Sequence, residues 1–503
     1  MKKFISVVSL LLLISILTAC GNAGDSNTVT DNNSVKSENG QEETTLDTNL
    51  RENTPDSLPA DLDFGGQVIR ILHREDTATW LPEIYVETEV GEIVSDTIYQ
   101  RNKSVEERLN IVIESKAIPG DWDAKDAYLN TIRNSVTSGS DDYDLIGGYA
   151  YYMPMLAPEG MLYNLMSVNY LDPTSIWWNA DSAKELTIDN KMYFITGDYS
   201  LSLLRMTFVL YFNKQLVEDY SIENLYQAVL DGNWTIDKLM DITKNVYSDI
   251  NGDGTADKSD MYGYSTTTGN FVDAYWFAFN HPIVSKDSND LPQLAYNTER
   301  MATMIDKIYG YFYDSGSAYP LTEYGSGDYN PQDDITDIFV GGRSIFMPQY
   351  LGFTDQLRTM ENDYGILPYP KWTADQKGYY TTSQNGHTIF CIPTTCKILD
   401  AVGAAMEALC AESYRKLTPV YFEVVLKEKY SRDSESSQML DIIRAGIKFD
   451  FGYSNGISLD YISNIFRDII TNKTNNFAST VESHLSKRQV MLDKLIEDYQ
   501  SLS

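Results

Sequence analysis

The apolar positions between residues 66 and 148 predict strands that alternate with helices. Three short apolar runs, at residues 66–72, 111–113 and 143–146, have the length and composition of buried strands. A helix between the first two is indicated by apolar positions at helical spacing: Val94, Ile98, Val105 and Leu109. A second helix, at 123–136, begins at an Asp suited to N-capping. This order predicts a parallel, doubly wound sheet, with ligands bound beyond the carboxyl ends of its strands.

Later elements follow from the same patterns. Residues 207–212 and 344–347 read as buried strands, and residues 364–372 as an extended crossing interrupted by prolines. Thr235 is a suitable N-cap for a helix whose apolar face is Leu239, Ile242 and Val246. After Cys396 the chain becomes largely helical, and the last helix is expected to open with a capping box at Ser479 and Glu482.

The first 20 residues form an export signal. Lys2 and Lys3 precede an apolar run at 4–17, which is shorter than the roughly 20 residues a membrane-spanning helix needs. The run ends in Leu-Thr-Ala-Cys-Gly at 17–21, which resembles the lipobox of bacterial lipoproteins and implies lipidation, such as palmitoylation, of Cys20. An ordinary secretory signal with an incidental cysteine is the alternative.

Residues 21–61 are polar and predict a disordered tether. We therefore expect a lipid-anchored protein on the extracytoplasmic face of the cell membrane.

Composition narrows the partners of the folded body. The formal net charge of −33 argues against nucleic acid or an anionic membrane surface as a partner. Besides Cys20 only Cys391, Cys396 and Cys410 are present, too few for a disulfide framework, although a bridge between Cys391 and Cys396 stays possible. Four histidines do not favour a Cys/His zinc site. The 36 tyrosines and 7 tryptophans suit sugar binding, although most should pack in the core.

Several landmarks occur in an order that resembles a known family. They are the strand at 143–146 followed by aromatics, and the segments KMYFITGDYS (191–200), FVLYFNKQLVEDY (208–220), DGNWTIDKL (231–239), FVGGRSIFM (339–347) and YGILPYPKW (364–372). Together they resemble the bacterial extracellular solute-binding proteins, sugar-binding and family 1-like, that serve ABC importers. The resemblance covers most of the chain after about Phe64.

This resemblance implies an α/β, two-lobed periplasmic-binding-protein fold of type 2, each lobe a doubly wound sheet flanked by helices, with a helical C-terminal region. By analogy, lobe one holds residues 62–205 and 364–415, and lobe two holds 206–363 and 416–503. The implied function is a monomeric receptor, not an enzyme, that captures a carbohydrate between the lobes. Ligand would shift the lobes to a closed form that an ABC permease recognises.

The resemblance also implies candidate ligand contacts. Those in or near lobe one are Arg74, Glu75, Tyr149, Tyr151 and Arg205; those in lobe two are Trp276 and Tyr350; those near the return crossing are Asn385 and His387. Aromatic faces would contact a pyranose ring, while the polar groups would satisfy its hydroxyls. Each also has a structural interpretation: Arg74 and Glu75 as a solvated pair, Trp276 as a core residue, and His387 as a buried histidine with satisfied hydrogen bonds.

An acidic loop at residues 249–260 matches the pattern of an EF-hand calcium loop. Its candidate ligands are Asp249, Asn251, Asp253, Thr255, Asp257 and Asp260. Position 12 is Asp rather than Glu, as in dockerin modules. A structural Ca²⁺ is the expectation, and an Asx-rich turn without metal is the alternative.

Two rival functions remain open from the sequence. A surface glycoside hydrolase would also use aromatics and carboxylates, but 72 acidic residues do not single out a catalytic pair. No zincin or phosphate-binding loop motif is present in the sequence. A solute-binding protein for peptides is the second rival.

Overall fold

The computed structural model describes residues 51–77, 81–322, 329–357, 360–427 and 434–502. Residues Asp47–Ser503 form one compact unit. The predicted signal and Cys20 lie outside the described residues, as do residues 21–50 of the predicted tether. The prediction of a disordered tether is wrong for residues 51–61, because Leu58 packs in a core cluster and Asp56 forms ion pairs with Arg108 and Arg415. No helix in the described ranges combines the length and the apolar character needed to cross a membrane.

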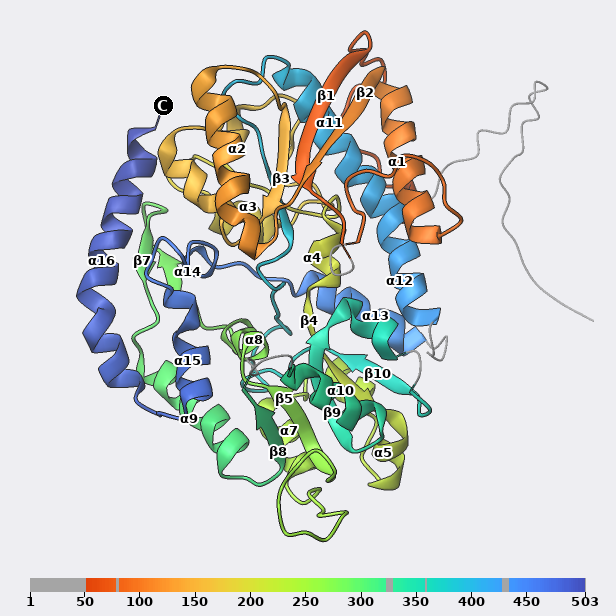
Figure 1. The fold of residues 1–503 in the computed structure, drawn as a ribbon, viewed down its shortest axis with the longest axis vertical. Coiled ribbons are helices and arrows are strands. Elements are labelled where there is room, and N and C mark those ends of the chain that lie inside the picture. Colours follow the sequence, from red (N-terminus) through yellow and green to blue (C-terminus); the bar gives the residue numbers. More distant parts are fainter. Residues whose placement is uncertain (1–50, 78–80, 323–328, 358–359, 428–433, 503) are drawn as a thin grey trace, which may run out of the picture. The chain divides into compact units, whose positions relative to one another are not determined.

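The first sheet has four strands in the order β11-β3-β1-β2. They are β1 (Gln67–Arg74), β2 (Ile111–Ile118), β3 (Leu145–Tyr149) and β11 (Thr388–Cys391). Helices α1 (Ile93–Leu109) and α11 (Leu399–Glu412) lie on one side of this sheet and α2 (Lys125–Ser138) on the other (Figure 1). Ile71 packs in the cluster that includes α1 and α11, whereas its neighbour Leu72 packs in the cluster that includes α2. Alternating residues of β1 therefore fill two layers.

The predicted strands and helices of this region are confirmed, but two details are wrong. The sheet is not fully parallel, because β11 pairs antiparallel with β3, while β1 pairs parallel with both β2 and β3. The second helix starts at Lys125, not Asp123: residues Trp122–Ala124 form a 3₁₀ turn, and no side chain caps α2.

The second sheet has five strands in the order β10-β4-β9-β5-β8. They are β4 (Phe208–Asn213), β5 (Tyr262–Thr267), β8 (Ala318–Leu321), β9 (Ser344–Tyr350) and β10 (Tyr364–Leu367). This sheet is mixed, since β4 pairs antiparallel with β9 and β10, while β5 pairs parallel with β8 and β9. Phe208 and Leu210 face one core cluster, whereas Val209 and Tyr211 face another. Burial on both faces explains why β4 is apolar throughout.

The helices around the second sheet follow its strands. They are α5 (Lys214–Asp219), α6 (Leu225–Leu230), α7 (Ile236–Thr243), α8 (Asn270–Ala278), α9 (Glu299–Tyr313) and α10 (Pro331–Val340). The predicted cap of α7 is confirmed, because the Thr235 side chain accepts the amide of Lys238. A small hairpin of β6 (Val284–Lys286) and β7 (Pro292–Leu294) lies apart from both sheets.

The C-terminal region is helical, as expected. Its helices are α12 (Thr418–Lys427), α13 (Ser434–Ala445), α14 (Phe451–Ser454), α15 (Ile465–Asn472) and α16 (Phe477–Ser501). The capping box predicted at Ser479 and Glu482 is wrong, because α16 already begins at Phe477 after Asn476, whose side chain makes no capping bond. The expected buried face is largely present, with Val481, Leu492 and Tyr499 buried.

The chain crosses between the two sheets at α4 (Leu201–Arg205) and again at residues 381–388. The amide of Phe208 donates to the carbonyl of Thr382 over 3.0 Å, and the amide of Gln384 donates to that of Met206 over 2.9 Å. The predicted return at residue 364 is wrong, because β10 pairs with β4 in the second sheet. The assignment of all of 416–503 to the second lobe is also too simple, because α12 contacts α1, and α16 contacts both the 3₁₀ helix Met153–Glu159 and α9.

A buried carboxylate on α11 binds the segment at residues 172–178 of the first lobe. Glu407 is fully buried and accepts the indole N–H groups of Trp177 (3.0 Å) and Trp178 (2.7 Å), the Ser175 hydroxyl (3.1 Å) and the Asp172 amide (3.2 Å). Burial raises the pKa of Glu407, and the four donors oppose that rise. The Trp-Trp pair is thus held by a single side chain.

We expect Glu407→Ala to lower the free energy of unfolding by about 2 to 5 kcal/mol, because it leaves several buried donors without an acceptor. Urea denaturation followed by tryptophan fluorescence measures the change. Glu159→Ala is the control, since Glu159 forms a partly exposed ion pair with Arg133 and should change stability by less than about 1 kcal/mol. Equal effects of the two substitutions would contradict this role of Glu407.

Candidate functional site

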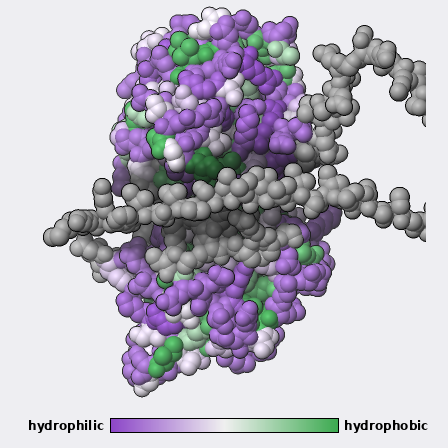
Figure 2. Space-filling model, turned by 90° about the vertical axis from the view of Figure 1, so that its right-hand side faces the viewer, coloured by the Kyte–Doolittle hydropathy of each residue, from purple (hydrophilic) through white to green (hydrophobic). Residues whose placement is uncertain are grey.

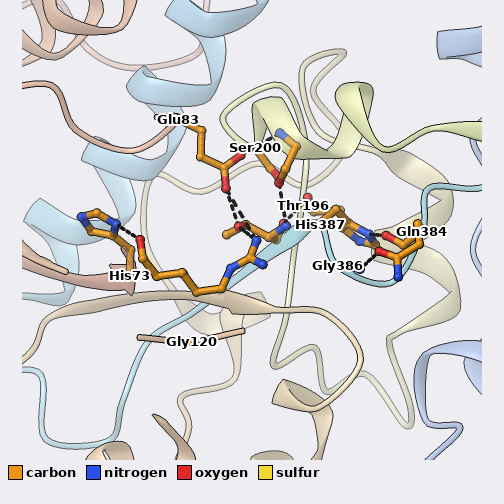
Figure 3. Close-up of polar contacts among 12 residues, drawn as sticks. His73, Glu83, Gly120, Thr196, Ser200, Gln384, Gly386 and His387 are labelled. Carbon is orange, nitrogen blue, oxygen red and sulfur yellow. Dashed lines mark hydrogen bonds and ion pairs between the residues drawn. The ribbon is translucent and has the colours of Figure 1, made fainter. Parts of the chain in front are cut away.

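A buried polar network joins the end of β1 to the start of β11 (Figure 3). Arg74 Nη2 donates to Thr388 Oγ1 over 2.9 Å, and that hydroxyl donates to Glu83. The second oxygen of Glu83 accepts the amide of Ser202 in α4 over 2.7 Å, while the Ser202 hydroxyl accepts the Thr388 amide over 3.0 Å. The network therefore fixes the ends of two strands against the first chain crossing.

Tyr149 connects this network to a cavity. The guanidinium of Arg74 lies over the Tyr149 ring, 5.2 Å from its centroid, and Tyr152 stacks on the same ring at 5.4 Å. The Tyr149 hydroxyl accepts a long hydrogen bond from Gln384 Nε2 at 3.5 Å. Two glycines make this placement possible: a Cβ at Gly148 would approach Met153 Sδ to 2.5 Å, and one at Gly147 would approach Phe390 to 3.0 Å. The Gly-Gly-Tyr order thus lets β3 run on to an aromatic at its carboxyl end.

The cavity has a volume of about 270 Å³ and a wall of aromatic and amide side chains. Its walls come from the ends of the first-sheet strands, the start of α8, the return crossing and the C-terminal helices. The lining residues are Trp122, Tyr149, Tyr151, Asn270, Gln384, Asn385, Tyr453, Tyr461, Asn464 and Arg467. We call this space the aromatic cavity. None of the described residues that line it is Asp or Glu.

The aromatic rings at one wall are held in place by their neighbours. Trp122 lies against Tyr151 with ring centroids 5.7 Å apart, and Lys125 lies over the indole of Trp122 at 4.9 Å. The Tyr151 hydroxyl is 3.4 Å from Ser463 Oγ, and burial raises the pKa of Tyr151 to about 12. Tyr151 is therefore a neutral phenol at physiological pH, able both to donate and to accept a hydrogen bond.

A buried carboxylate positions the opposite wall. Asp273 of α8 is fully buried and accepts Arg467 Nε over 3.1 Å and the Tyr453 hydroxyl over 3.1 Å; Arg467 Nη2 also forms an ion pair with it. Asp273 does not itself line the cavity. It ties α14 and α15 to α8 and offsets the charge of Arg467 behind the cavity wall.

Three of the predicted ligand contacts meet at the aromatic cavity: Tyr149, Tyr151 and Asn385. Two other predicted contacts, Arg74 and Glu75, do not line the aromatic cavity. Arg74 is buried behind Tyr149 in the polar network, so the interpretation of Arg74 and Glu75 as a solvated pair is wrong for Arg74. Glu75 is exposed and, with Asp76, borders a separate small depression.

The remaining predicted contacts lie elsewhere. Trp276 is only 1% exposed and packs edge-to-face on Phe466 at 5.8 Å. Tyr350 lies between the rings of Phe208 and Phe271, each 5.3 Å away, in the packing of the second sheet. Trp276 therefore matches its structural interpretation as a core residue.

His387 and Arg205 also lie away from the aromatic cavity. His387 is buried with its Nδ1 3.0 Å from the carbonyl of Gln384, and burial lowers its pKa to about 4, so it is neutral at physiological pH. Arg205 lines a different cavity.

Sequence reasoning missed the half of the aromatic cavity that the C-terminal region supplies. Tyr453, Tyr461, Asn464 and Arg467 all lie within about one turn of α14 or α15. A signal was present, because the segment FGYSNGISLDYISN (451–464) concentrates Tyr and Asn in a short stretch. No local pattern indicated that this segment faces Trp122.

The acidic loop forms Asx-type turns. Asp249 accepts the amides of Gly252 (2.7 Å) and Gly254 (2.8 Å), both of which have positive φ, and Asp253 accepts the amide of Thr255 (2.7 Å). Buried Asp260 accepts the amide of Ile250 at 3.1 Å. Within the described ranges no group of three or more His, Cys, Asp or Glu side chains is placed to hold a metal ion. The calcium site stays a prediction, and it requires several of these carboxylates to turn inward.

The cysteines of the folded body are not bridged. Cys391, Cys396 and Cys410 are free and buried. Burial raises the pKa of the Cys396 thiol to about 11, so it is inert as a nucleophile at neutral pH.

Solved structures resemble this chain over most of its length. A cyclo/maltodextrin-binding protein in complex with maltotetraose has a TM-score of 0.55 and 12% identity, with coverage of 86% of this chain and 97% of that chain. A family 1 extracellular solute-binding protein from Bifidobacterium longum subsp. infantis has a TM-score of 0.53 and 11% identity, covering 84% and 100%. An ABC substrate-binding protein from Listeria monocytogenes in complex with cycloalternan has a TM-score of 0.51 and 12% identity, covering 85% and 99%.

The chain has the two-lobed periplasmic-binding-protein fold. The predicted α/β fold class is confirmed, with one sheet in each lobe and a helical C-terminal region. No protein-family model and no curated protein matches the sequence. In this two-lobed fold, the aromatic cavity has walls on β3 of the first lobe and α8 of the second.

The calcium prediction can be tested by isothermal titration of calcium-stripped protein. We expect one Ca²⁺ site and a rise in melting temperature on binding, because a cation would relieve the repulsion among the four Asp of the loop. Asp253→Ala, which removes one predicted ligand from an exposed position, should weaken binding. Absence of both heat and thermal stabilisation would end the calcium assignment.

Proposed function

We propose that this chain is the extracytoplasmic receptor of an ABC importer and that it holds a sugar or oligosaccharide in the aromatic cavity. The composition of the cavity wall carries the proposal. Five aromatic rings offer flat apolar faces for sugar rings, while four amides, from Asn270, Gln384, Asn385 and Asn464, offer both donors and acceptors to hydroxyl groups. Arg467 adds donors whose charge is offset by Asp273.

The origin of the walls supports capture by lobe closure. Tyr149 and Tyr151 follow a strand of the first lobe, Asn270 begins a helix of the second, and Asn385 lies on the crossing between them. A ligand that contacts all of them makes its full set of interactions only when the lobes approach. Binding would therefore shift the population toward a closed form that a membrane permease can distinguish.

The structural neighbours support a carbohydrate ligand. One was solved with maltotetraose and another with cycloalternan. Both are binding proteins by name, which favours a receptor over an enzyme for the same fold.

The lining of the aromatic cavity does not favour the glycoside hydrolase alternative. Glycosidases of the common types place two carboxyl groups on either side of the scissile bond. The described lining of the aromatic cavity includes no such group, and the nearest buried acid, Asp273, is engaged by Arg467 and Tyr453. A peptide-binding receptor remains the second alternative, because amides and aromatic rings also suit a peptide backbone.

A membrane anchor on Cys20 fits this function. We propose that the lipid and the polar residues 21–50 hold the receptor close to its permease, while the folded body works as a monomer. The lipidated chain would then lie on the extracytoplasmic face of the cell membrane.

A thermal-shift screen tests the ligand class, with maltotetraose and cycloalternan among the oligosaccharides, and short peptides as competitors. We expect oligosaccharides to raise the melting temperature. Tyr461→Ala should then weaken the best oligosaccharide about tenfold by isothermal titration, because an exposed stacking ring contributes roughly 1 to 1.5 kcal/mol.

Tyr220→Ala is the matched control, since Tyr220 is 43% exposed and Tyr461 is 46% exposed, but Tyr220 does not line the cavity. Stabilisation by peptides alone would overturn the sugar assignment. Hydrolysis of the oligosaccharide by purified protein would favour the enzyme instead.

Cys20→Ala tests the anchor. We expect the variant to leave the membrane fraction while its ligand affinity stays within about twofold of the wild type, because Cys20 is not among the residues that line the aromatic cavity. Cell fractionation and titration of the released protein measure the two effects. A variant that remains with the membrane would refute lipid anchoring through this residue.

A further inference from the structure

A second cavity lies where the first crossing meets helices of both lobes. Its volume is about 260 Å³, and it shares no lining residue with the aromatic cavity. The walls come from the start of α1, from α4, from α12 and from the 3₁₀ helix Leu351–Leu357. Figure 2 views the side on which α1 and α12 lie and shows a recessed hydrophobic area among mostly hydrophilic residues.

Arg205 gives this cavity a positive charge that no carboxylate of the described residues binds directly. Among the arginines that the structure describes, all others donate a hydrogen bond or form an ion pair, whereas Arg205 does neither. This is notable in a chain with 72 acidic and 39 basic residues. A guanidinium beside an apolar wall is expected to find a carboxylate when one is within reach.

The one carboxylate on the described wall of this cavity is already used. Glu92 is the N-cap of α1, and its two oxygens accept the amides of Val94 (3.0 Å) and Ser95 (2.7 Å). These bonds lower the pKa of Glu92, although burial opposes them, so the group stays ionised as the cap. Its capping role keeps it off Arg205.

The rest of the wall is mainly apolar. Leu81, Pro82, Val94 and Leu201 line the cavity with Arg205, and Thr354 adds a hydroxyl. The wall thus combines one unpaired cationic donor with a short apolar surface.

We propose that this cavity is a second ligand site, which binds a small carboxylate with a short apolar chain, its carboxylate on Arg205 and its chain against Leu81, Val94 and Leu201. Arg binds a carboxylate through two parallel N–H donors. Burial of the chain supplies the remaining stabilisation.

Hexanoate is the probe for this site, and isothermal titration of the wild-type protein should show a single binding event. Arg205→Met keeps the apolar stem and removes the charge, and it should weaken hexanoate at least tenfold. Arg205→Lys, which keeps the charge, should recover part of the affinity. Arg133→Met is the control, because Arg133 pairs with Glu159 away from the cavity.

Further comparisons separate this site from the aromatic cavity. Hexanol should bind much more weakly than hexanoate, since it lacks the charge, and Tyr461→Ala should leave hexanoate binding unchanged. No binding of hexanoate to the wild-type protein would overturn the proposal, as would equal affinity in Arg205→Met. Either result would leave the proposed sugar binding intact, because that is measured at a different cavity.

Discussion

The pairing of the two chain crossings is the constraint on which the rest of the structure depends. Residues 206–208 and 381–384 exchange backbone hydrogen bonds, and the Thr381 hydroxyl adds a bond to the Phe208 carbonyl at 2.7 Å. These groups are buried between two sheets, where an unsatisfied backbone polar group is costly. The paired crossings therefore form a hydrogen-bonded strip between the lobes, and the residues just beside it occupy the junction between them.

Both cavities are consequences of that strip. Gln384 extends from the return crossing to the aromatic cavity, and Arg205 extends from the first crossing to the second cavity. The aromatic cavity is further supported by two buried carboxylates, Glu83 behind the first-lobe wall and Asp273 behind the opposite wall. Buried charges contribute little net stability but constrain geometry when every donor and acceptor is used. These hydrogen bonds restrict the motion of the side chains around the cavity before a ligand binds. The entropic cost of binding is lower as a result.

The sequence predicted the elements better than their assembly. Short apolar runs indicated β1, β2, β3 and β4, because each of these strands buries several apolar side chains within a few residues. It could not give the direction of β11 or the sheet to which β10 belongs, since both depend on partners more than 140 residues away in the chain.

At the candidate site, too, local sequence indicated some residues, whereas tertiary packing decided the position of others. Tyr149 and Tyr151 were found because they follow a predicted strand, and ligands bind there in such sheets. The sequence could not decide whether Trp276 lies in the core or in a cavity, because an aromatic residue has the same local pattern in both places. Arg467 was missed because only tertiary packing brings α15 to face Trp122.

Two arginines show how the same side chain can serve opposite purposes. Arg467 reaches the aromatic cavity with Asp273 bound behind it, so it offers N–H donors without adding net charge to the wall. Such a wall suits hydroxyl groups and gives no advantage to an anion. Arg205 has no described carboxylate bound to it, and Glu92, the one acid on the described wall of its cavity, accepts the amides of Val94 and Ser95 in α1. Its charge remains available, and the neighbouring wall is apolar. The difference between a neutral and an anionic ligand in these two cavities therefore rests on whether a buried acid stands behind the guanidinium.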